Sequence, residues 1–266
     1  MANSERILNT NIELQECVDM AKMLPNKPTI TALSVNENGV YTPDNGVGGF
    51  APVIVDVRDT NFADLITNNL TTVDSDVTSI RQYAFRGATK LKSVNLPNAT
   101  TIGSNAFYAC SVLESVNMPK VETLSDNVFN SCGKLASISL PSLTTSGTYT
   151  FRSCPVMLTA DLGKLTSIPA GLFYYSYRLR TVILRSETLC TLANTNAFAN
   201  CYHLTGTQNN SYNPNGDKDC YIYVPRALIE DYKVATNWST YETQFRALED
   251  YTIDGTITGE FDINKI

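Results

Sequence analysis

The chain of 266 residues holds few side chains whose type and spacing could support catalysis. A Ser-His-Asp arrangement would have to use the single histidine, His203, with Ser176 or Ser211 as the nucleophile. No G-x-S-x-G elbow or other nucleophile motif accompanies these residues. Glycoside hydrolysis needs two carboxylates in a cleft, and Asp161 is the only acid on the strand positions that could line one. We therefore interpret His203 as a partly exposed rim residue and predict that the protein is not an enzyme.

Metal-binding patterns are equally sparse. Neither C-x-x-C nor H-E-x-x-H occurs, so zinc has no recognisable ligand set. One loop mimics part of a calcium site, because oxygen-bearing residues alternate around a glycine. They are Asn213, Asn215, Asp217 and Asp219, around Gly216. The bidentate glutamate expected at the twelfth position of such a loop is Val224, so a solvated turn is the plainer interpretation. We predict no metal and no cofactor.

A repeat of phenylalanines defines the elements that must position these side chains. The six are Phe85, Phe107, Phe129, Phe151, Phe173 and Phe198, which lie 22 residues apart except for a last interval of 25. Apolar residues recur nine and eleven positions after the phenylalanine, which places them on one face of a short strand. A strict period of this kind indicates a solenoid, in which each unit buries its apolar face against the next. We predict an α/β solenoid in which one strand and one turn or irregular arc per unit stack into a parallel sheet.

Four of the seven cysteines fall in one column of the repeat, three residues after the phenylalanine. The column reads Ala88, Cys110, Cys132, Cys154, Ser176 and Cys201. The alanine and serine show that the position requires a small side chain, so we interpret the cysteines as reduced core thiols. A disulfide between neighbouring coils is geometrically possible, because adjacent strands lie about 5 Å apart.

Other elements flank the repeats. Residues 1–58 are predicted to form a short helix with Leu14 to Leu24, followed by strands at 32–35 and 53–57. Residues 59–225 form the solenoid, whose first coil is sealed by a half-repeat at 62–76. Its apolar residues are Leu65, Ile66, Leu70 and Val73. Residues 226–266 form a helical cap that begins at Pro225 and continues near 239–248, with Trp238 plugging the last coil. The tail after Tyr251 is predicted to be a weak strand or a frayed end.

Composition limits the classes of partner. The net charge is −6, and residues 71–225 carry 12 basic against 9 acidic side chains, far from a nucleic-acid footprint. No run of 18 apolar residues exists, so no membrane insertion is predicted. The first residues, MANSERILNTN, lack an apolar signal region. That absence favours a phage protein, which leaves the cell by lysis, over a secreted bacterial one.

The repeat pattern IgxxAFxxCxxLxxVxLP, over residues 77–225, resembles the BspA-like leucine-rich repeat of bacterial surface proteins. The resemblance implies a right-handed superhelix with its parallel sheet on the concave side. The string ENGVYTPDNGVGGFAPVIVDV resembles a β-module of phage tail and minor structural proteins of Gram-positive hosts. The segment NPNGDKDCYIYVPRALIEDYKVATNWSTY is similar to the closing segment found in such phage and prophage products.

Two surfaces combine the side chains that binding sites favour. A concave strip places charge and aromatic rings on outward strand positions, namely Asp161, Arg180, Ile183, Tyr221 and Tyr223. A second group of rings follows the phenylalanine column, namely Tyr174, Tyr175, Tyr177 and Tyr202. The alternative is that these tyrosines merely cover coil edges.

Together these features predict non-enzymatic recognition of a protein or glycan on a bacterial or host cell surface. A phage or prophage virion protein is the first expectation and a BspA-like bacterial adhesin is the second. A purely structural virion component is the third. Each of these places the protein on a virion, on a cell surface or outside the cell.

Overall fold

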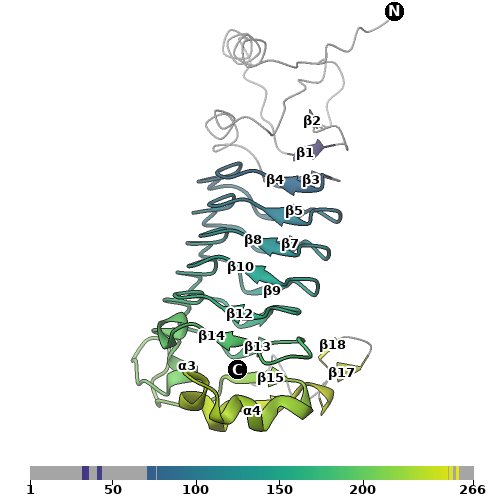
Figure 1. Ribbon diagram of the computed structural model, residues 1–266. Helices are drawn as coiled ribbons and strands as arrows, with labels where there is room; N and C mark the ends of the chain where they lie inside the picture. Colours follow the sequence, from purple (N-terminus) through teal and green to yellow (C-terminus); the bar gives the residue numbers. More distant parts are fainter. Residues whose placement is uncertain are drawn as a thin grey trace, which may run out of the picture.

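The computed structural model describes residues 71–75 and 77–250, together with short strands at 32–35, 41–43, 252–253 and 256–257. Successive coils of the chain stack into a rod, with β3 near one end and α4 across the other (Figure 1). The predicted α/β solenoid of stacked parallel strands is confirmed.

Each coil contributes one strand to each of two parallel ladders. The first ladder is divided into two hydrogen-bonded sheets. One includes β3 (Thr72–Ser75), β5 (Ser93–Asn95) and β7 (Ser115–Asn117), and the other includes β9 (Ser137–Ser139), β11 (Thr159–Asp161), β13 (Thr181–Ile183) and β15 (Tyr221–Val224). The second ladder is divided likewise, into β4 (Ser79–Ile80), β6 (Thr101–Ile102), β8 (Thr123–Leu124) and β10 (Thr145–Ser146), and then β12 (Ser167–Ile168) and β14 (Thr191–Leu192). Equivalent residues pair between coils, as Ser93 with Ser115, so the 22-residue period sets the register.

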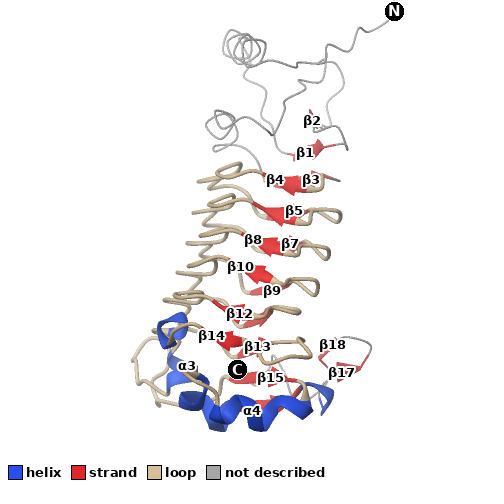
Figure 2. Ribbon diagram, viewed as in Figure 1, coloured by secondary structure: helices blue, strands red, loops and turns tan. Residues whose placement is uncertain are grey.

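A third side of the rod, which we call the turn arc, carries no strand. It comprises the residues from two before to two after each of the first five phenylalanines, 83–87, 105–109, 127–131, 149–153 and 171–175. Alternate N–H groups of the arc donate to the next coil, as Asn105 N to Asp126 O (2.9 Å) and Phe107 N to Val128 O (3.0 Å). The remaining N–H groups close turns within the coil, as Tyr108 N to Asn105 O (3.2 Å). The predicted irregular arc is therefore extensively hydrogen-bonded, and among the described coils of the solenoid only the last contains helices. These are η2 (Thr195–Phe198) and α3 (Tyr202–Thr205), at the foot of the stacked loops in Figure 2.

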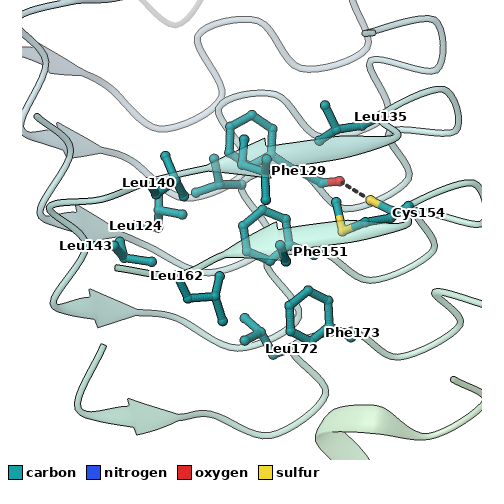
Figure 3. Packing of buried hydrophobic residues seen from close by; sticks show 14 of the residues in the cluster. Leu124, Phe129, Leu135, Leu140, Leu143, Phe151, Cys154, Leu162, Leu172 and Phe173 are labelled. Carbon is teal, nitrogen blue, oxygen red and sulfur yellow. Dashed lines mark hydrogen bonds between the residues drawn. The ribbon is translucent and has the colours of Figure 1, made fainter. Parts of the chain in front are cut away.

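The phenylalanine column forms the centre of the core (Figure 3). Neighbouring rings stack with centroids 5.2 to 5.7 Å apart, and all six side chains are fully buried. This distance is slightly larger than the spacing of adjacent strands, about 4.8 Å, so offset-stacked rings fit the coil repeat without strain.

The side chains of the cysteine column donate hydrogen bonds to the backbone carbonyls of the phenylalanine column. Cys110 donates from Sγ to Phe85 O (3.1 Å), and Cys154 donates to Phe129 O (3.3 Å). Ser176 makes the equivalent bond to Phe151 O at 2.8 Å. Six cysteines in the described part of the chain are free and buried, and the four of the column are among them. The column therefore selects a short donor as well as a small side chain.

The N-terminal end of the first ladder is extended by strands from outside the repeats. The predicted strand at 32–35 is confirmed as β1 (Ala32–Val35). It pairs in parallel with β3 and in antiparallel fashion with β2 (Tyr41–Pro43). Val73 of the predicted half-repeat is buried. The predicted helix at 14–24, the strand at 53–57 and the residues Leu65, Ile66 and Leu70 lie outside the described residues.

The C-terminal cap agrees with prediction in its first part only. The strand at 221–224 is confirmed, and η3 (Arg226–Leu228) and α4 (Ile229–Val234) follow Pro225 as expected. The prediction of a helix at 239–248 is wrong beyond Gln244. A 3-10 helix, η4 (Trp238–Gln244), leads into β16 (Phe245–Ala247), which pairs in parallel with β15. Phe245 and Ala247 alternate inward while β15 offers an unpaired edge, so strand geometry satisfies both the apolar side chains and the backbone.

The cap is closed by the tryptophan. Trp238 is fully buried, its ring lies 6.0 Å from that of Phe198, and its Nε1 donates to Cys190 O at 2.6 Å. Beyond it lie η5 (Leu248–Asp250) and the antiparallel pair β17 (Thr252–Ile253) and β18 (Thr256–Ile257), so the predicted weak strand in the tail is confirmed. Among the described helices, none has the length and apolar character required to cross a bilayer.

Candidate binding surfaces

The concave strip is much less exposed than the alternation of its strands predicts. Asp161, Ile183 and Tyr223 are buried, with exposed fractions of 6%, 2% and 7%. The outward residues Ser137 and Ser139 of β9 are exposed, whereas all three residues of β13 are buried. Strand alternation identifies the face on which a residue lies, but it cannot reveal that the same face becomes covered further along the rod.

The polar members of the strip are engaged with other side chains of the chain. Asp161 accepts from Arg185, with Nη2 2.8 Å from Oδ2, and from the backbone of Gly163. Arg180 forms an ion pair with Asp219. Tyr221 is half-buried, and the guanidinium of Arg246 lies 4.2 Å from its ring centroid. The strip therefore consists largely of satisfied internal contacts, with Tyr221 as its accessible ring.

His203 is a buried anchor and not the partly exposed rim residue that we predicted. Only 3% of the residue is exposed. Its Nδ1 lies 2.6 Å from Oδ1 of Asp219, and its Nε2 lies 2.8 Å from the carbonyl oxygen of Tyr212. Burial lowers the pKa of His203, and the positive charge of Arg180 acts in the same direction. Both ring nitrogens are thus occupied, and Ser176 donates to Phe151 O instead of to this ring. The arrangement fastens the loop at 206–219 to the last coil.

The loop that mimics a calcium site folds around the side-chain amide of Asn213. Asn213 is fully buried rather than solvated. Its Nδ2 donates to the carbonyls of Tyr202 (3.1 Å), Thr207 (3.3 Å) and Asp217 (3.0 Å), and its Oδ1 accepts from Asp217 N (2.9 Å). Its oxygen is therefore committed to the loop itself. Within the described residues, no group of three His, Cys, Asp or Glu side chains is placed to hold a metal ion.

The four predicted tyrosines lie together and belong to a larger group. Tyr174 and Tyr175 meet edge to face with centroids 4.3 Å apart, and Tyr175 lies 5.9 Å from Tyr177. Tyr177 stacks on Tyr202 at 5.4 Å and on Tyr212 at 4.5 Å. All five rings are half-buried, so each presents a face or an edge to solvent.

Two residues of the preceding coil continue this group. The guanidinium of Arg152 lies 5.4 Å from the ring centroid of Tyr149 and 5.5 Å from that of Tyr174. We call the whole set the tyrosine cluster. It comprises Tyr149, Arg152, Tyr174, Tyr175, Tyr177, Tyr202 and Tyr212. Sequence reasoning missed Tyr149, Arg152 and Tyr212, although the first two occupy columns two before and one after the phenylalanine, where alignment of the coils could have found them.

Two tyrosines of the cluster have an unfavourable backbone conformation. Tyr149 and Tyr175 have φ of 57° and 66°, in the left-handed region that bulky residues rarely adopt. Tyr83, at the position equivalent to Tyr149, also has a positive φ, of 63°. The remaining equivalent positions in other coils carry asparagine, glycine or small residues. They are Asn105, Asn127 and Gly171 for Tyr149, and Gly87, Ala109, Ser131, Ser153 and Asn200 for Tyr175. A tyrosine here costs about 1 kcal/mol or more in backbone strain, so folding alone does not account for the choice.

Comparison with known proteins agrees with the repeat geometry. The family model described as a BspA type leucine rich repeat region matches residues 56–180 in six copies. These residues are similar to BspA-type leucine-rich repeats. The BspA-type match ends at residue 180, but the coil of Phe198 and β15 continue the same sheet to Val224. The tyrosine cluster therefore spans the end of the BspA-type repeats and the coil that follows them.

Several solved structures are similar to this chain. A leucine rich cell surface protein from Faecalibacterium prausnitzii is 28% identical, over 47% of this chain and 41% of its own, with a TM-score of 0.41. A T. pallidum leucine rich repeat protein is 24% identical, over 49% of this chain and 69% of its own, with a TM-score of 0.41. The pneumococcal vaccine antigen PcpA is 16% identical, over 71% of this chain and 41% of its own, with a TM-score of 0.47. This chain thus spans less than half the length of the first of them. None of the curated proteins matches it.

Proposed function

We propose that the protein is a non-enzymatic recognition protein that binds a protein or glycan on a cell surface through the tyrosine cluster. The observation that carries the proposal is the placement of Tyr149 and Tyr175 on left-handed backbone, within a half-exposed group of rings and a guanidinium. Aromatic rings and arginines of this kind dominate the energy of binding sites. Strained residues that the fold does not require are concentrated at sites of function.

The setting that we propose is a virion or a cell surface. BspA-type repeats support surface display, and the phage-like strings at residues 37–57 and 213–241 support a phage or prophage product. Mass spectrometry of purified particles and of cell walls, after treatment of the source strain with a DNA-damaging agent, separates these settings. Peptides found in particles would support the virion, and peptides confined to the wall would contradict it.

The test of the binding surface uses changes that relieve strain. Asparagine suits left-handed backbone and occupies the equivalent positions 105, 127 and 200. We therefore expect Tyr149→Asn with Tyr175→Asn to unfold in urea at the same concentration as the parent or a higher one. The same variant should bind at least about tenfold more weakly to its ligand on an array of glycans and extracellular-matrix proteins, since two aromatic contacts are lost.

Tyr221→Ala is the matched control, because it removes a half-buried tyrosine from the concave strip. Unchanged binding by this control, with loss in the double variant, supports the tyrosine cluster. The opposite result moves the site to the strip. Binding that neither change affects would contradict recognition through tyrosines of the solenoid.

A further inference from the structure

The charges of the solenoid are segregated around each coil. Consider the segments that run from four residues before each phenylalanine to seven after it, 81–92, 103–114, 125–136, 147–158 and 169–180. They contain eight of the 12 basic residues of 71–225 but only two of the nine acidic ones. The eight are Arg81, Arg86, Lys90, Lys92, Lys134, Arg152, Arg178 and Arg180. This side of the rod, which contains the turn arc, is therefore strongly basic, although the whole chain is acidic.

The two acids leave a formal excess of six positive charges over the five segments, eight minus two. Asp126 is engaged with the next coil, since its Oδ1 accepts from N and Oγ1 of Thr148 at 2.7 and 2.9 Å. Glu114 stands at the end of its segment, beside β7. Arg180 forms an ion pair with Asp219, so we do not count it toward the charge of this side.

The positive groups alternate with aromatic rings along the axis of the rod. Arg86 lies over Tyr83 (5.6 Å) and Tyr108 (5.2 Å), as Arg152 lies over Tyr149 and Tyr174 three coils later. In the column five residues after the phenylalanine, the exposed residues Lys90, Lys134 and Arg178 recur at every second coil. Two coils span about 10 Å, twice the spacing of strands in a sheet, which is close to the length of a disaccharide.

We propose that this basic side of the rod, which contains the turn arc, binds an acidic polysaccharide, which lies along the solenoid axis with its sugar faces against the tyrosine cluster and its carboxylates against Arg152 and Arg178. This proposal rests on the recognition function proposed above and names its class of ligand. A sugar ring has an apolar C–H face and a polar rim, which suits the half-exposed rings of tyrosine. The planar guanidinium forms paired hydrogen bonds with a carboxylate.

A nucleic acid fits the same surface less well. The chain has a net charge of −6, so a densely charged polymer would meet repulsion from the rest of the molecule. A polysaccharide with one carboxylate per one or two sugars matches the widely spaced positive charges of the five basic segments. Competition by a single-stranded oligodeoxynucleotide is therefore part of the test.

The experiment measures binding of the full chain to polygalacturonate, alginate and hyaluronate at low ionic strength, each beside its methyl-esterified form. We expect at least one acid form to bind, its ester to bind at least about tenfold more weakly, and added salt to weaken the complex. Arg152→Gln with Arg178→Gln should weaken binding about tenfold, because two charge-assisted hydrogen bonds are lost. Lys120→Gln with Lys164→Gln, which makes the same change of charge outside the five segments, should bind as the parent does.

Four results would overturn the proposal: no binding to any of the three acid forms, equal binding to acid and ester, equal losses in the two double variants, or equal affinity for the oligodeoxynucleotide. Failure here is distinct from failure of the recognition function. If Tyr149→Asn with Tyr175→Asn abolishes binding to an array ligand while the arginine variant does not, the tyrosine cluster remains the site and its ligand is not acidic.

Discussion

The cysteine column shows how two requirements act on a single residue. The position three after each phenylalanine must be small, because it lies between coils, and it must donate to the phenylalanine carbonyl of the preceding coil. Cysteine and serine satisfy both requirements. Alanine occurs only in the first phenylalanine coil, at Ala88. A thiol in this place is therefore a structural donor, and burial makes it a poor nucleophile.

The buried thiols predict a loss of stability in alkali. Burial raises the pKa of Cys110, Cys154 and Cys190 from 9.0 to about 12. The unfolded chain ionises its thiols near pH 9 while the folded chain keeps them neutral, so stability present at neutral pH is lost as the pH rises. The loss begins near pH 9 and continues toward pH 12, and in this window the free energy of unfolding should fall by up to about 1.4 kcal/mol per pH unit for each thiol.

Urea unfolding at several pH values measures this slope. Cys110→Ser is the control, because the hydroxyl can make the bond that Ser176 makes in its own coil. This change should reduce the slope without abolishing folding. A slope that is unaffected by removing the thiol would show that other groups cause the alkaline loss.

At the scale of elements, the loop at 206–219 folds around one side chain. We expect Asn213→Ala to open this loop, because three carbonyls lose their donor and the Asp217 amide loses its acceptor. Limited proteolysis should cleave the variant between residues 206 and 219 at least about tenfold faster, the factor that corresponds to 1.4 kcal/mol. Asn215→Ala changes an exposed residue of the same loop and should be cleaved at the parent rate. Equal rates for all three proteins would mean that His203 and Asp219 hold the loop without Asn213.

The elements that follow the 22-residue period could be predicted from the sequence, because each coil repeats the same burial pattern. The phenylalanine core and the strands from β5 to β13 are of this kind. The strand β16 could not be predicted, since its pairing depends on the free edge of β15 and not on local periodicity. For the same reason Asp161 and Tyr223 were placed on an exposed strip, although only tertiary structure shows that this face is covered there. The predicted tyrosines do lie together, because they recur in the columns of adjacent coils.

In the described repeats the molecule is a stack in which the strands of each coil pair with those of neighbouring coils. Stability in such a stack is a sum of coil and interface contributions, and the ends need caps. Trp238, Tyr232 and Phe245 supply the C-terminal cap, with Trp238 centred 5.5 Å from Tyr232 and 5.8 Å from Phe245. Damage to a cap should therefore propagate inward from one end.

We expect Trp238→Ala to cost about 3–5 kcal/mol and to act mainly on the last coils. Hydrogen exchange should accelerate in the amides of residues 190–204 and change little in those of residues 94–118. Phe129→Ala, in the middle of the column, is the comparison, and it should accelerate exchange in both directions along the rod. Uniform acceleration in the Trp238 variant would show that the solenoid unfolds as one cooperative unit.

The hydrogen bonds of the turn arc run one way along the rod, and this gives the molecule an electrical polarity. In the peptide units joining Ser104 to Asn105 and Ala106 to Phe107, the carbonyl points to the preceding coil and the N–H to the following one. Each peptide unit has a dipole of about 3.5 D, and aligned units in a helix sum to about half an elementary charge at each end. The stacked arcs repeat this alignment, so their dipoles add along the axis with the positive end beside Tyr175 and the cap. This partial positive charge lies at the end of the rod that carries the acidic C-terminal segment, residues 226–266 with 4 basic and 8 acidic side chains, and therefore offsets part of that segment's negative charge.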